Sequence, residues 1–258
     1  MGLTGHPPAF ANILFSGPCN QRCPDCIGRR LPRRPANLDR FPVAGLERFC
    51  ARLVRGGARQ LTLTGTDTDP LLYRHLDRLV DELRRRVPGV RLNLHTNGRL
   101  ALARIALVNR CDRACLSLSS FVPATSERMT GRRGVLPLER ILEVSRVPIK
   151  VSVLVTGRNV AEVPAIIARC RALGLRRLVL RRCFGEGRRW PLLAGHSPVR
   201  RFAGNPVYDL DGLEVTVWDF ERSALSCLNL FSDGTITEQY LLARGREARD
   251  DPRAAAVG

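Results

Sequence analysis

The chain lacks a long hydrophobic run, and it contains very little lysine and few aromatic residues. No segment of its 258 residues reaches the roughly 20 consecutive apolar residues that a membrane-spanning helix needs. The first residues lack the basic region of a secretory signal peptide, so we expect a cytoplasmic protein with no membrane partner. Aromatic residues make up 5% of the chain, and Lys150 is the one lysine among 42 basic residues.

The net charge of +18 therefore comes almost wholly from arginine. Strong positive charge is common in proteins that bind nucleic acids. Here the arginines are scattered along the chain and do not alternate with aromatic residues, which favours a solvated surface shaped by codon usage. The charge permits a nucleic-acid partner but the pattern does not favour one, and an anionic substrate such as a phosphate ester is an alternative.

The nine cysteines do not indicate a disulfide scaffold, because their number is odd and disulfides are rare in the reducing cytosol. Cys50 and Cys170 lie on apolar stripes of helical spacing and are expected in the core. Cys19, Cys23 and Cys26 are spaced C-x-x-x-C-x-x-C on a short loop that follows an apolar run. Three such thiolates can hold an iron–sulfur cluster and leave one iron open. Zinc usually takes four protein ligands, and no partner pair follows at a convincing distance.

Apolar strands alternate with amphipathic helices between residues 11 and 182. The candidate strands are Ala11–Ser16, Gln60–Thr64, Val90–His95, Ala114–Leu118, Ile149–Val155 and Arg176–Leu180. The candidate helices are Val43–Val54, Leu72–Arg86, Ala101–Asn109, Leu138–Ser145 and Val160–Leu173. This alternation predicts an α/β fold, a partial (β/α)6 barrel with parallel strands. Such folds place their sites at the carboxyl ends of the strands, where the three-cysteine loop lies.

The C-terminal part of the chain is less regular. Val207–Asp219 reads as a β-hairpin with Asp211-Gly212 in its turn, and a second hairpin is expected around Asp233-Gly234. We therefore expect a barrel over residues 1–205, a small β-hairpin extension over 206–243 and a disordered tail over 244–258.

The cysteine spacing resembles the signature of the radical S-adenosylmethionine (SAM) superfamily. This resemblance implies that Cys19, Cys23 and Cys26 hold a [4Fe–4S] cluster whose open iron chelates SAM. Reductive cleavage then gives a 5′-deoxyadenosyl radical, which abstracts hydrogen from a substrate. The resemblance also implies oxygen sensitivity and an electron donor such as flavodoxin or ferredoxin. A small-molecule or peptide substrate is expected for a barrel of this size.

The segment after the second strand is similar to the Gly-Gly-Glu-Pro segment with which these enzymes hold the SAM amino group. Thr64-Gly65 and Pro70-Leu71-Leu72 match that segment, which implies SAM contacts from Gly65, Thr66 and Asp67. The plain alternative is a polar turn capped by Asp69 ahead of Pro70.

The next three strands carry further matches. Thr96-Asn97-Gly98 resembles a segment that follows the third strand in the family, and Ser117 occupies the position of a serine that contacts SAM. Lys150 is similar to a lysine that pairs with the SAM carboxylate in the branch containing the GTP cyclase of molybdenum-cofactor biosynthesis. Thr96, Asn97, Ser117 and Lys150 are therefore expected to bind SAM. His95 is more easily explained as a structural histidine than as a proton donor.

Two features depart from that branch. Asp25 stands where the superfamily usually has an aromatic residue near the adenine. The segment around Cys227 resembles the surroundings of the cyclase's second cluster, but Gln239 and Tyr240 stand where a ligand cysteine would be expected. Without a C-terminal three-cysteine set, a second cluster and GTP cyclisation are not expected.

The substrate side is expected after the sixth strand, at Arg181, Arg182, Cys183 and Glu186. The Cys183 thiol is the candidate catalytic residue, because it could quench a product radical. Two other functions stay open: a radical enzyme that modifies RNA, and a non-catalytic iron–sulfur protein that kept the fold but lost SAM binding.

Overall fold

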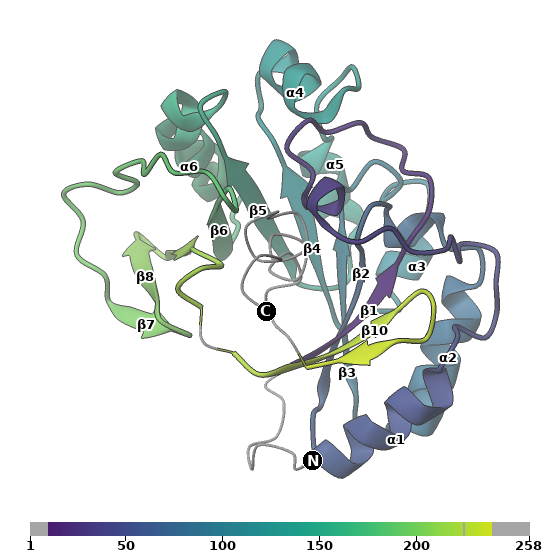
Figure 1. The fold of residues 1–258 in the computed structure, drawn as a ribbon. Helices are drawn as coiled ribbons and strands as arrows, with labels where there is room; N and C mark the ends of the chain where they lie inside the picture. Colours follow the sequence, from purple (N-terminus) through teal and green to yellow (C-terminus); the bar gives the residue numbers. More distant parts are fainter. Residues whose placement is uncertain (1–9, 224, 239–258) are drawn as a thin grey trace, which may run out of the picture.

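The computed structural model describes residues 10–223 and 225–238, and these residues form one open sheet of eleven strands. The strand order is β11-β10-β1-β2-β3-β4-β5-β6-β9-β8-β7. Figure 1 shows the sheet curving like part of a barrel, with its helices on the outer side. The predicted α/β fold, a partial barrel of parallel strands with a C-terminal hairpin extension, is confirmed.

The six central strands are parallel and match the predicted ones within two residues at each end. They are β1 (Phe10–Phe15), β2 (Gln60–Gly65), β3 (Arg91–Thr96), β4 (Arg113–Leu118), β5 (Ile149–Val155) and β6 (Arg177–Arg182). The α-helices are α1 (Leu46–Gly56), α2 (Leu76–Arg86), α3 (Ile105–Val108), α4 (Pro123–Thr130), α5 (Leu138–Val144) and α6 (Val163–Ala172). Short 3₁₀ helices cover Ile27–Arg30, Pro70–Leu72 and Val160–Glu162.

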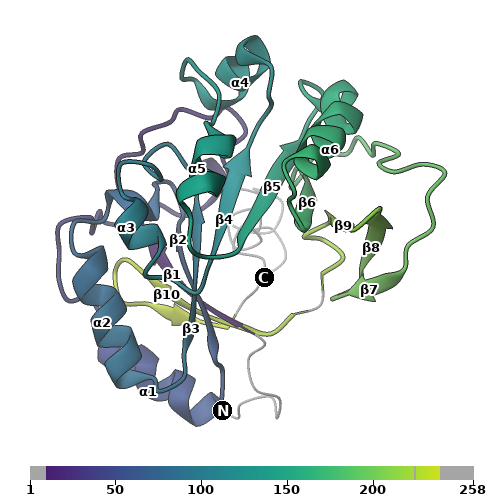
Figure 2. The ribbon, with the colours of Figure 1, turned by 180° about the vertical axis from the view of Figure 1, so that it is seen from behind.

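The sequence analysis did not predict helix α4. It begins with Pro123 in its first turn, where a missing N–H costs nothing, and ends at Gly131, whose φ of 64° suits a helix C-cap. Figure 2 shows α4 beyond the carboxyl end of β4, away from the row formed by the other helices. Its weak apolar stripe explains why periodicity did not reveal it.

The C-terminal strands extend the same sheet at both edges. They are β7 (Arg200–Phe202), β8 (Asn205–Leu210), β9 (Leu213–Trp218), β10 (Cys227–Phe231) and β11 (Ile236–Thr237). Both expected hairpins are present, with Asp211 and Gly212 at positive φ in the first turn. Strand β9 pairs in parallel with β6, and β10 pairs in parallel with β1. The predicted division at residue 205 stays a prediction, and the tail over 244–258 lies outside the described residues.

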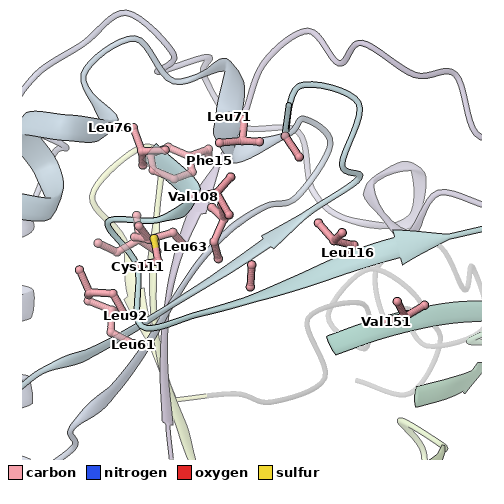
Figure 3. Close-up of a cluster of buried hydrophobic side chains, with 14 of the residues drawn as sticks. Phe15, Leu61, Leu63, Leu71, Leu76, Leu92, Val108, Cys111, Leu116 and Val151 are labelled. Carbon is pink, nitrogen blue, oxygen red and sulfur yellow. The ribbon is translucent and has the colours of Figure 1, made fainter. Parts of the chain in front are cut away.

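The hydrophobic core lies between the sheet and the helices. Every second side chain of the central strands points into it, including Leu61, Leu92, Leu116 and Val151. Figure 3 shows these side chains with Cys111 in one cluster. Because side chains alternate, the remaining positions of the strands face the opposite, concave side of the sheet.

The cysteines expected in the core are there. Cys50 is 3% exposed and Cys170 is fully buried, and both belong to the apolar cluster. All nine cysteines are free thiols. No helix in the described part of the chain is both long and apolar enough to cross a membrane.

Candidate active site

The three-cysteine loop leaves the carboxyl end of β1 and returns to it at Asn37. The Ser16 amide donates to Asn37 Oδ1 at 3.1 Å, and the Asn37 amide donates to Ser16 O at 3.0 Å. Asn37 is 2% exposed, so these bonds are shielded from water. They close the base of the loop and fix the position of the segment that carries Cys19, Cys23 and Cys26.

The loop after β2 supports the cysteine loop from one side. The Gly17 amide donates to Asp67 Oδ1 at 3.2 Å, and Thr68 Oγ1 donates to Pro18 O at 2.6 Å. A Cβ atom at Gly28 would lie 2.5 Å from Thr66 O. The two backbones therefore approach more closely than any side chain at residue 28 would permit.

The loops after β4 and β5 support it from the other side. The Arg22 amide donates to Thr130 O of α4 at 2.8 Å, and Arg132 Nε donates to Asn20 O at 3.0 Å. Arg158, after β5, donates to Asp25 Oδ2 at 2.6 Å. The unexpected helix α4 thus anchors the cysteine loop.

The cysteine sulfurs lie half-buried; Cys19 Sγ accepts hydrogen bonds from the protein, and Cys23 Sγ donates to Gln21 Oε1 at 3.4 Å. Cys19 Sγ accepts from the Gln21 amide at 3.4 Å and lies 3.9 Å from Asn97 Nδ2. Burial raises the pKa of the Cys23 thiol to about 11, and the nearby sulfurs of Cys26 and Cys19 act in the same direction. Burial also raises the pKa of Cys19. The Cys19 and Cys23 thiols are therefore protonated near neutral pH, and metal binding has to release their protons.

The donor set fits a [4Fe–4S] cluster. Among residues 10–223 and 225–238, no three Cys, His, Asp or Glu side chains converge on a point that one metal ion could occupy. In a cubane each thiolate binds its own iron, so three sulfurs surround the cluster and do not share one centre. Three half-buried thiols on one anchored loop are donors of the kind that such a cluster takes.

The predicted SAM residues at the end of β2 fold into a tight turn. A Cβ atom at Gly65 would lie 2.0 Å from Thr68 O, so residue 65 has to be glycine. The Thr66 amide donates to Phe15 O at 2.8 Å, and Thr66 Oγ1 lies 3.0 Å from Asp67 Oδ1. Gly65, Thr66 and Asp67 therefore lie directly beside the cysteine loop. The roles in SAM binding stay predictions.

Asp69 connects this turn to the end of β3. Its carboxylate accepts from the Leu71 amide at 2.9 Å, which confirms the expected cap, and from the Asn97 amide at 2.6 Å. Thr96 Oγ1 lies 2.9 and 2.8 Å from its two oxygens. Asp69 is 2% exposed, and burial raises its pKa while these hydrogen bonds oppose the rise. The sequence analysis gave Asp69 only a capping role, and no local pattern marks its partners in β3.

Two of the predicted SAM residues line a narrow recess beside the cysteines. Asn97 Nδ2 donates to Asn20 Oδ1 at 2.7 Å, which fixes its side chain against the loop. The recess has mostly polar walls that come from the cysteine loop, β3, β4 and α4. They include Gln21, Asn97, Ser117, Ser119, Ser126 and Thr130. Thr96, by contrast, is buried and its hydroxyl faces Asp69.

Lys150 lies deeper, on the concave face of the sheet. It pairs in register with Cys115, which pairs with His95. Water reaches His95 through the open concavity, but the surrounding strands reduce its hydration. This desolvation by the surrounding strands lowers the pKa of His95 to about 3, although its side chain is exposed on the concave face, and the positive charges of Lys150 and Arg181 add to the effect. His95 is therefore a neutral imidazole at physiological pH.

Cys183 follows β6 at the same end of the sheet and lies half-buried. Burial raises the pKa of its thiol, and Asp25 and Glu186 act in the same direction. Gly185, in the same loop, approaches the Arg30 guanidinium so closely that a Cβ atom would lie 2.0 Å from Nη1. The loop that carries Cys183 thus contacts the cysteine loop.

The remaining cysteines are separated from one another. Cys111 packs in the apolar core, whereas Cys115 faces the concave side of β4. Cys227, 1% exposed, lies in β10 and accepts from Asn229 Nδ2 at 3.3 Å. Gln239 and Tyr240 lie outside the described residues.

Comparison with known proteins identifies relatives of one enzymatic type. No protein-family model matches the chain. A GTP 3′,8-cyclase from Rhodopseudomonas palustris (strain ATCC BAA-98 / CGA009) is 28% identical over 178 residues, covering 64% of this chain and 50% of the cyclase. The chain thus spans about half the length of the curated relatives that it matches.

Two solved structures share the fold. SuiB from Streptococcus suis has a TM-score of 0.62 at 14% identity, covering 96% of this chain and 67% of SuiB. The structure of anSMEcpe with bound AdoMet has a TM-score of 0.54 at 16% identity, covering 70% of this chain and 55% of anSMEcpe. The curated relatives are enzymes by name and the two solved structures share the fold, and the reaction of this chain is left open.

Proposed function

Starting from a chain that belongs with the radical SAM enzymes, we propose that it cleaves SAM reductively at a [4Fe–4S] cluster held by Cys19, Cys23 and Cys26. Bound at that cluster, SAM would supply a 5′-deoxyadenosyl radical for the abstraction of hydrogen from a small-molecule or peptide substrate. The observation that carries this proposal is the anchoring of one three-thiol loop by the loops after β2, β3, β4 and β5. All of them lie at the carboxyl edge of the sheet, where parallel α/β folds bind their ligands.

In this proposal the chain's own groups hold and orient the cofactors. The Gln21 amide and Asn97 Nδ2, both near Cys19 Sγ, stabilise thiolate charge. The turn of Gly65, Thr66 and Asp67 offers backbone and hydroxyl oxygens to an ammonium group. Asn97 and Ser117 lie in the recess next to the cysteines, where a ribose hydroxyl could be bound, and Thr96 supports this edge through Asp69.

Lys150 is proposed to pair with the SAM carboxylate. It lies on the concave face, and within the described part of the chain it takes part in no ion pair. A compact ammonium on a long flexible stem can reach from β5 toward the carboxyl edge.

The relatives support this cofactor set and leave the substrate open. One solved structure of SuiB contains its precursor peptide SuiA, and anSMEcpe has been solved with AdoMet and with peptides. The R. palustris relatives are GTP cyclases by name. The chain has a single cysteine after Cys183, Cys227, and so lacks a three-cysteine set for a second cluster there. We propose a substrate other than GTP.

Cys183 is proposed to donate a hydrogen atom to the product radical. The S–H bond breaks homolytically, the hydrogen atom joins the product carbon, and the thiyl radical left on Cys183 takes an electron and a proton. The same electron donor that reduces the cluster, a flavodoxin or ferredoxin, would supply that electron. The raised pKa of Cys183 keeps its thiol protonated, as this role requires.

The first test is SAM cleavage by anaerobically reconstituted protein reduced with dithionite. We expect 5′-deoxyadenosine from the parent chain and from the control Cys50→Ala, but none from the triple variant Cys19→Ala/Cys23→Ala/Cys26→Ala. A cluster that forms without SAM cleavage would favour the non-catalytic alternative. Retention of zinc with no cluster would contradict the proposal.

The role of Cys183 needs its own measurement. With a substrate in hand, Cys183→Ala should still release 5′-deoxyadenosine but should lose the product that has gained solvent-derived hydrogen. Turnover equal to that of the parent chain would exclude Cys183 as the donor. Steep salt dependence of RNA binding by the parent chain would favour the RNA-modifying alternative.

A further inference from the structure

Arginines that are scattered along the sequence form a row at one edge of the folded sheet. Strands β2 to β6 are parallel neighbours, and each begins at or shortly after an exposed arginine. Arg59 and Arg176 directly precede β2 and β6, Arg91 and Arg113 are the first residues of β3 and β4, and Arg146 lies three positions before β5. These five residues form the basic row.

The basic row lies at the amino edge of the sheet, opposite the three-cysteine loop. Figure 2 shows the arrows of β4 and β5 pointing toward the end where α4 lies, so their amino ends lie at the other end. The backbone keeps the row continuous, because the Arg91 amide donates to Arg59 O at 2.7 Å and the Ala114 amide donates to Pro148 O at 3.1 Å. Neighbouring strands are about 4.8 Å apart, so five strands spread the row over about 19 Å.

The guanidinium groups of the basic row form no hydrogen bond or ion pair within residues 10–223 and 225–238. Two arginines that lie three positions after a strand, at the carboxyl edge, differ in this respect. Arg99 donates to the carbonyl oxygens of residues 132, 133 and 134, and Arg158 donates to Asp25 Oδ2. Those arginines hold loops in place, whereas the basic row is open to a partner.

The carboxylates at the amino edge leave the row with an excess of positive charge. Asp112, Asp211 and Glu214 pair with arginines outside the row, at distances from 2.5 to 3.7 Å. Glu143 and Asp209 are exposed and have no ion pair in the part of the chain that the structure describes. They offset at most two of the five positive charges.

Helix dipoles explain other arginines of this edge but not the row. Helices α1, α2 and α6 carry basic residues in their last turns, where the negative end of the helix dipole stabilises a cation. The basic row lies outside every helix, in strands and turns. Its like charges repel one another across neighbouring strands, and a polyanion bound along the row would neutralise them.

We propose that the basic row binds the phosphate backbone of a nucleic acid without reading its sequence. Regularly spaced cations are sufficient for phosphate contacts, and the release of counterions drives such binding. None of the residues adjacent to the row in the chain is aromatic, so the row offers no platform on which bases could stack. A protein partner would also need an apolar centre. The exposed valines near this edge, Val54 and Val144, belong to the separate helices α1 and α5.

This inference goes beyond the proposed function and is independent of it. The basic row and the loop of Cys19, Cys23 and Cys26 lie at opposite ends of the same strands, so a nucleic acid held at the row leaves the proposed SAM site uncovered. Binding through the backbone also does not require the nucleic acid to be the substrate.

The test is a fluorescence anisotropy titration of a labelled oligouridine of about 20 nucleotides, repeated at several salt concentrations. The edge variant, Arg59→Gln/Arg91→Gln/Arg113→Gln, removes three charges of the row. The matched control, Arg40→Gln/Arg74→Gln/Arg140→Gln, removes three exposed arginines that likewise have no ion pair among the described residues. The two variants have the same net charge, so a general charge effect would weaken both equally.

We expect the parent chain to bind oligouridine with an affinity that falls steeply as salt rises. Each phosphate contact on a single strand contributes about 0.7 to the slope of log affinity against log salt, so the edge variant should lower that slope by about 2 and bind about tenfold or more weakly at about 0.1 M salt. The control variant should change the affinity less than about threefold. If the triple variant does not fold, Arg113→Gln alone should lower the slope by about 0.7, and Arg74→Gln should leave it unchanged.

Equal weakening in the two triple variants, or no binding by the parent chain at about 0.15 M salt, would overturn the inference. Polyglutamate that displaces the oligouridine at equal charge concentration would assign the row to an acidic protein and would overturn it as well. SAM cleavage, measured in the same preparations, should be equal in the parent chain and both variants. Its absence from all three proteins would contradict the proposed function, while binding that depends on the row would still support this inference.

Discussion

Replacement of Asp69 by alanine should destabilise the protein and disturb the cysteine loop together. The Asp69 carboxylate is 2% exposed and accepts hydrogen bonds from the Leu71 amide, the Asn97 amide and the Thr96 hydroxyl. These donors belong to the turns after β2 and β3. Asn97 in turn contacts Asn20 and lies near Cys19 Sγ, so the change reaches the proposed cluster site.

The magnitude follows from the donors left without an acceptor. Each buried donor that loses its partner costs about 1–3 kcal/mol, so three donors set an upper range of roughly 3–9 kcal/mol. Two effects reduce this cost: water can enter the space, and the variant no longer buries a carboxylate whose raised pKa shows that burial disfavours its charge. We expect a net loss of about 2–4 kcal/mol, a large part of the roughly 5–15 kcal/mol typical of a domain.

The conservative variant sharpens this prediction. Asp69→Asn keeps one acceptor oxygen but turns an NH₂ group toward a donor, so it should lose about half as much. The exposed Asp77, in the first turn of α2, is the matched control, and Asp77→Ala should change stability by less than about 0.5 kcal/mol.

The assay is urea unfolding followed by circular dichroism, with iron content measured after anaerobic reconstitution. We expect stability and iron retention to fall in the order parent chain, Asp69→Asn, Asp69→Ala. A stability of Asp69→Ala within about 0.5 kcal/mol of the parent chain would refute the reasoning, because surface-like changes have that size. Full iron retention in a clearly destabilised Asp69→Ala would refute the link between Asp69 and the cysteine loop.

Three further predictions concern the same edge of the sheet. Gly65→Ala places a Cβ atom 2.0 Å from the backbone carbonyl oxygen of Thr68, so we expect the free energy of unfolding to fall by about 1–3 kcal/mol and iron retention to decrease. Gly187→Ala, which has open space around it, is the control and should behave like the parent chain. His95 has a pKa of about 3 in the folded chain and 6.5 when unperturbed, so the free energy of unfolding should fall as the pH drops below 6.5. The stability of His95→Gln should depend less on acid. An NMR titration that shows a protonated imidazole just below pH 6.5 would contradict this prediction. The half-exposed ion pair between Asp25 and Arg158 should contribute less than about 1 kcal/mol in a double-mutant cycle, and a larger coupling would mean that the pair is better shielded from water than its exposure indicates.

Local sequence patterns predicted most of the central fold. Alternating apolar residues identified β1 to β6, and the Asp211-Gly212 turn identified the hairpin of β8 and β9. These features depend on neighbours in the chain, on side-chain alternation and on positive φ. The spacing of Cys19, Cys23 and Cys26 is local in the same sense, and it led to the type of enzyme that the relatives support.

Other features depend on contacts between distant segments. Nothing in the sequence of β9 or β10 shows that they pair with β6 and β1, because backbone hydrogen bonding across a sheet is independent of residue type. Helix α4 has too weak an apolar stripe to be recognised, although Thr130 at its end anchors Arg22.

The chain by itself therefore determined the order of strands and helices and the loop on which a cluster would be held. Only the tertiary structure decided what surrounds that loop. It placed Asp69 between two turns, joined Asp25 to Arg158, and brought His95, Lys150 and Arg181 onto one concave face. Those residues are separated by many positions in the chain, and only the curvature and register of the sheet make them neighbours, so no short-range pattern records their contacts.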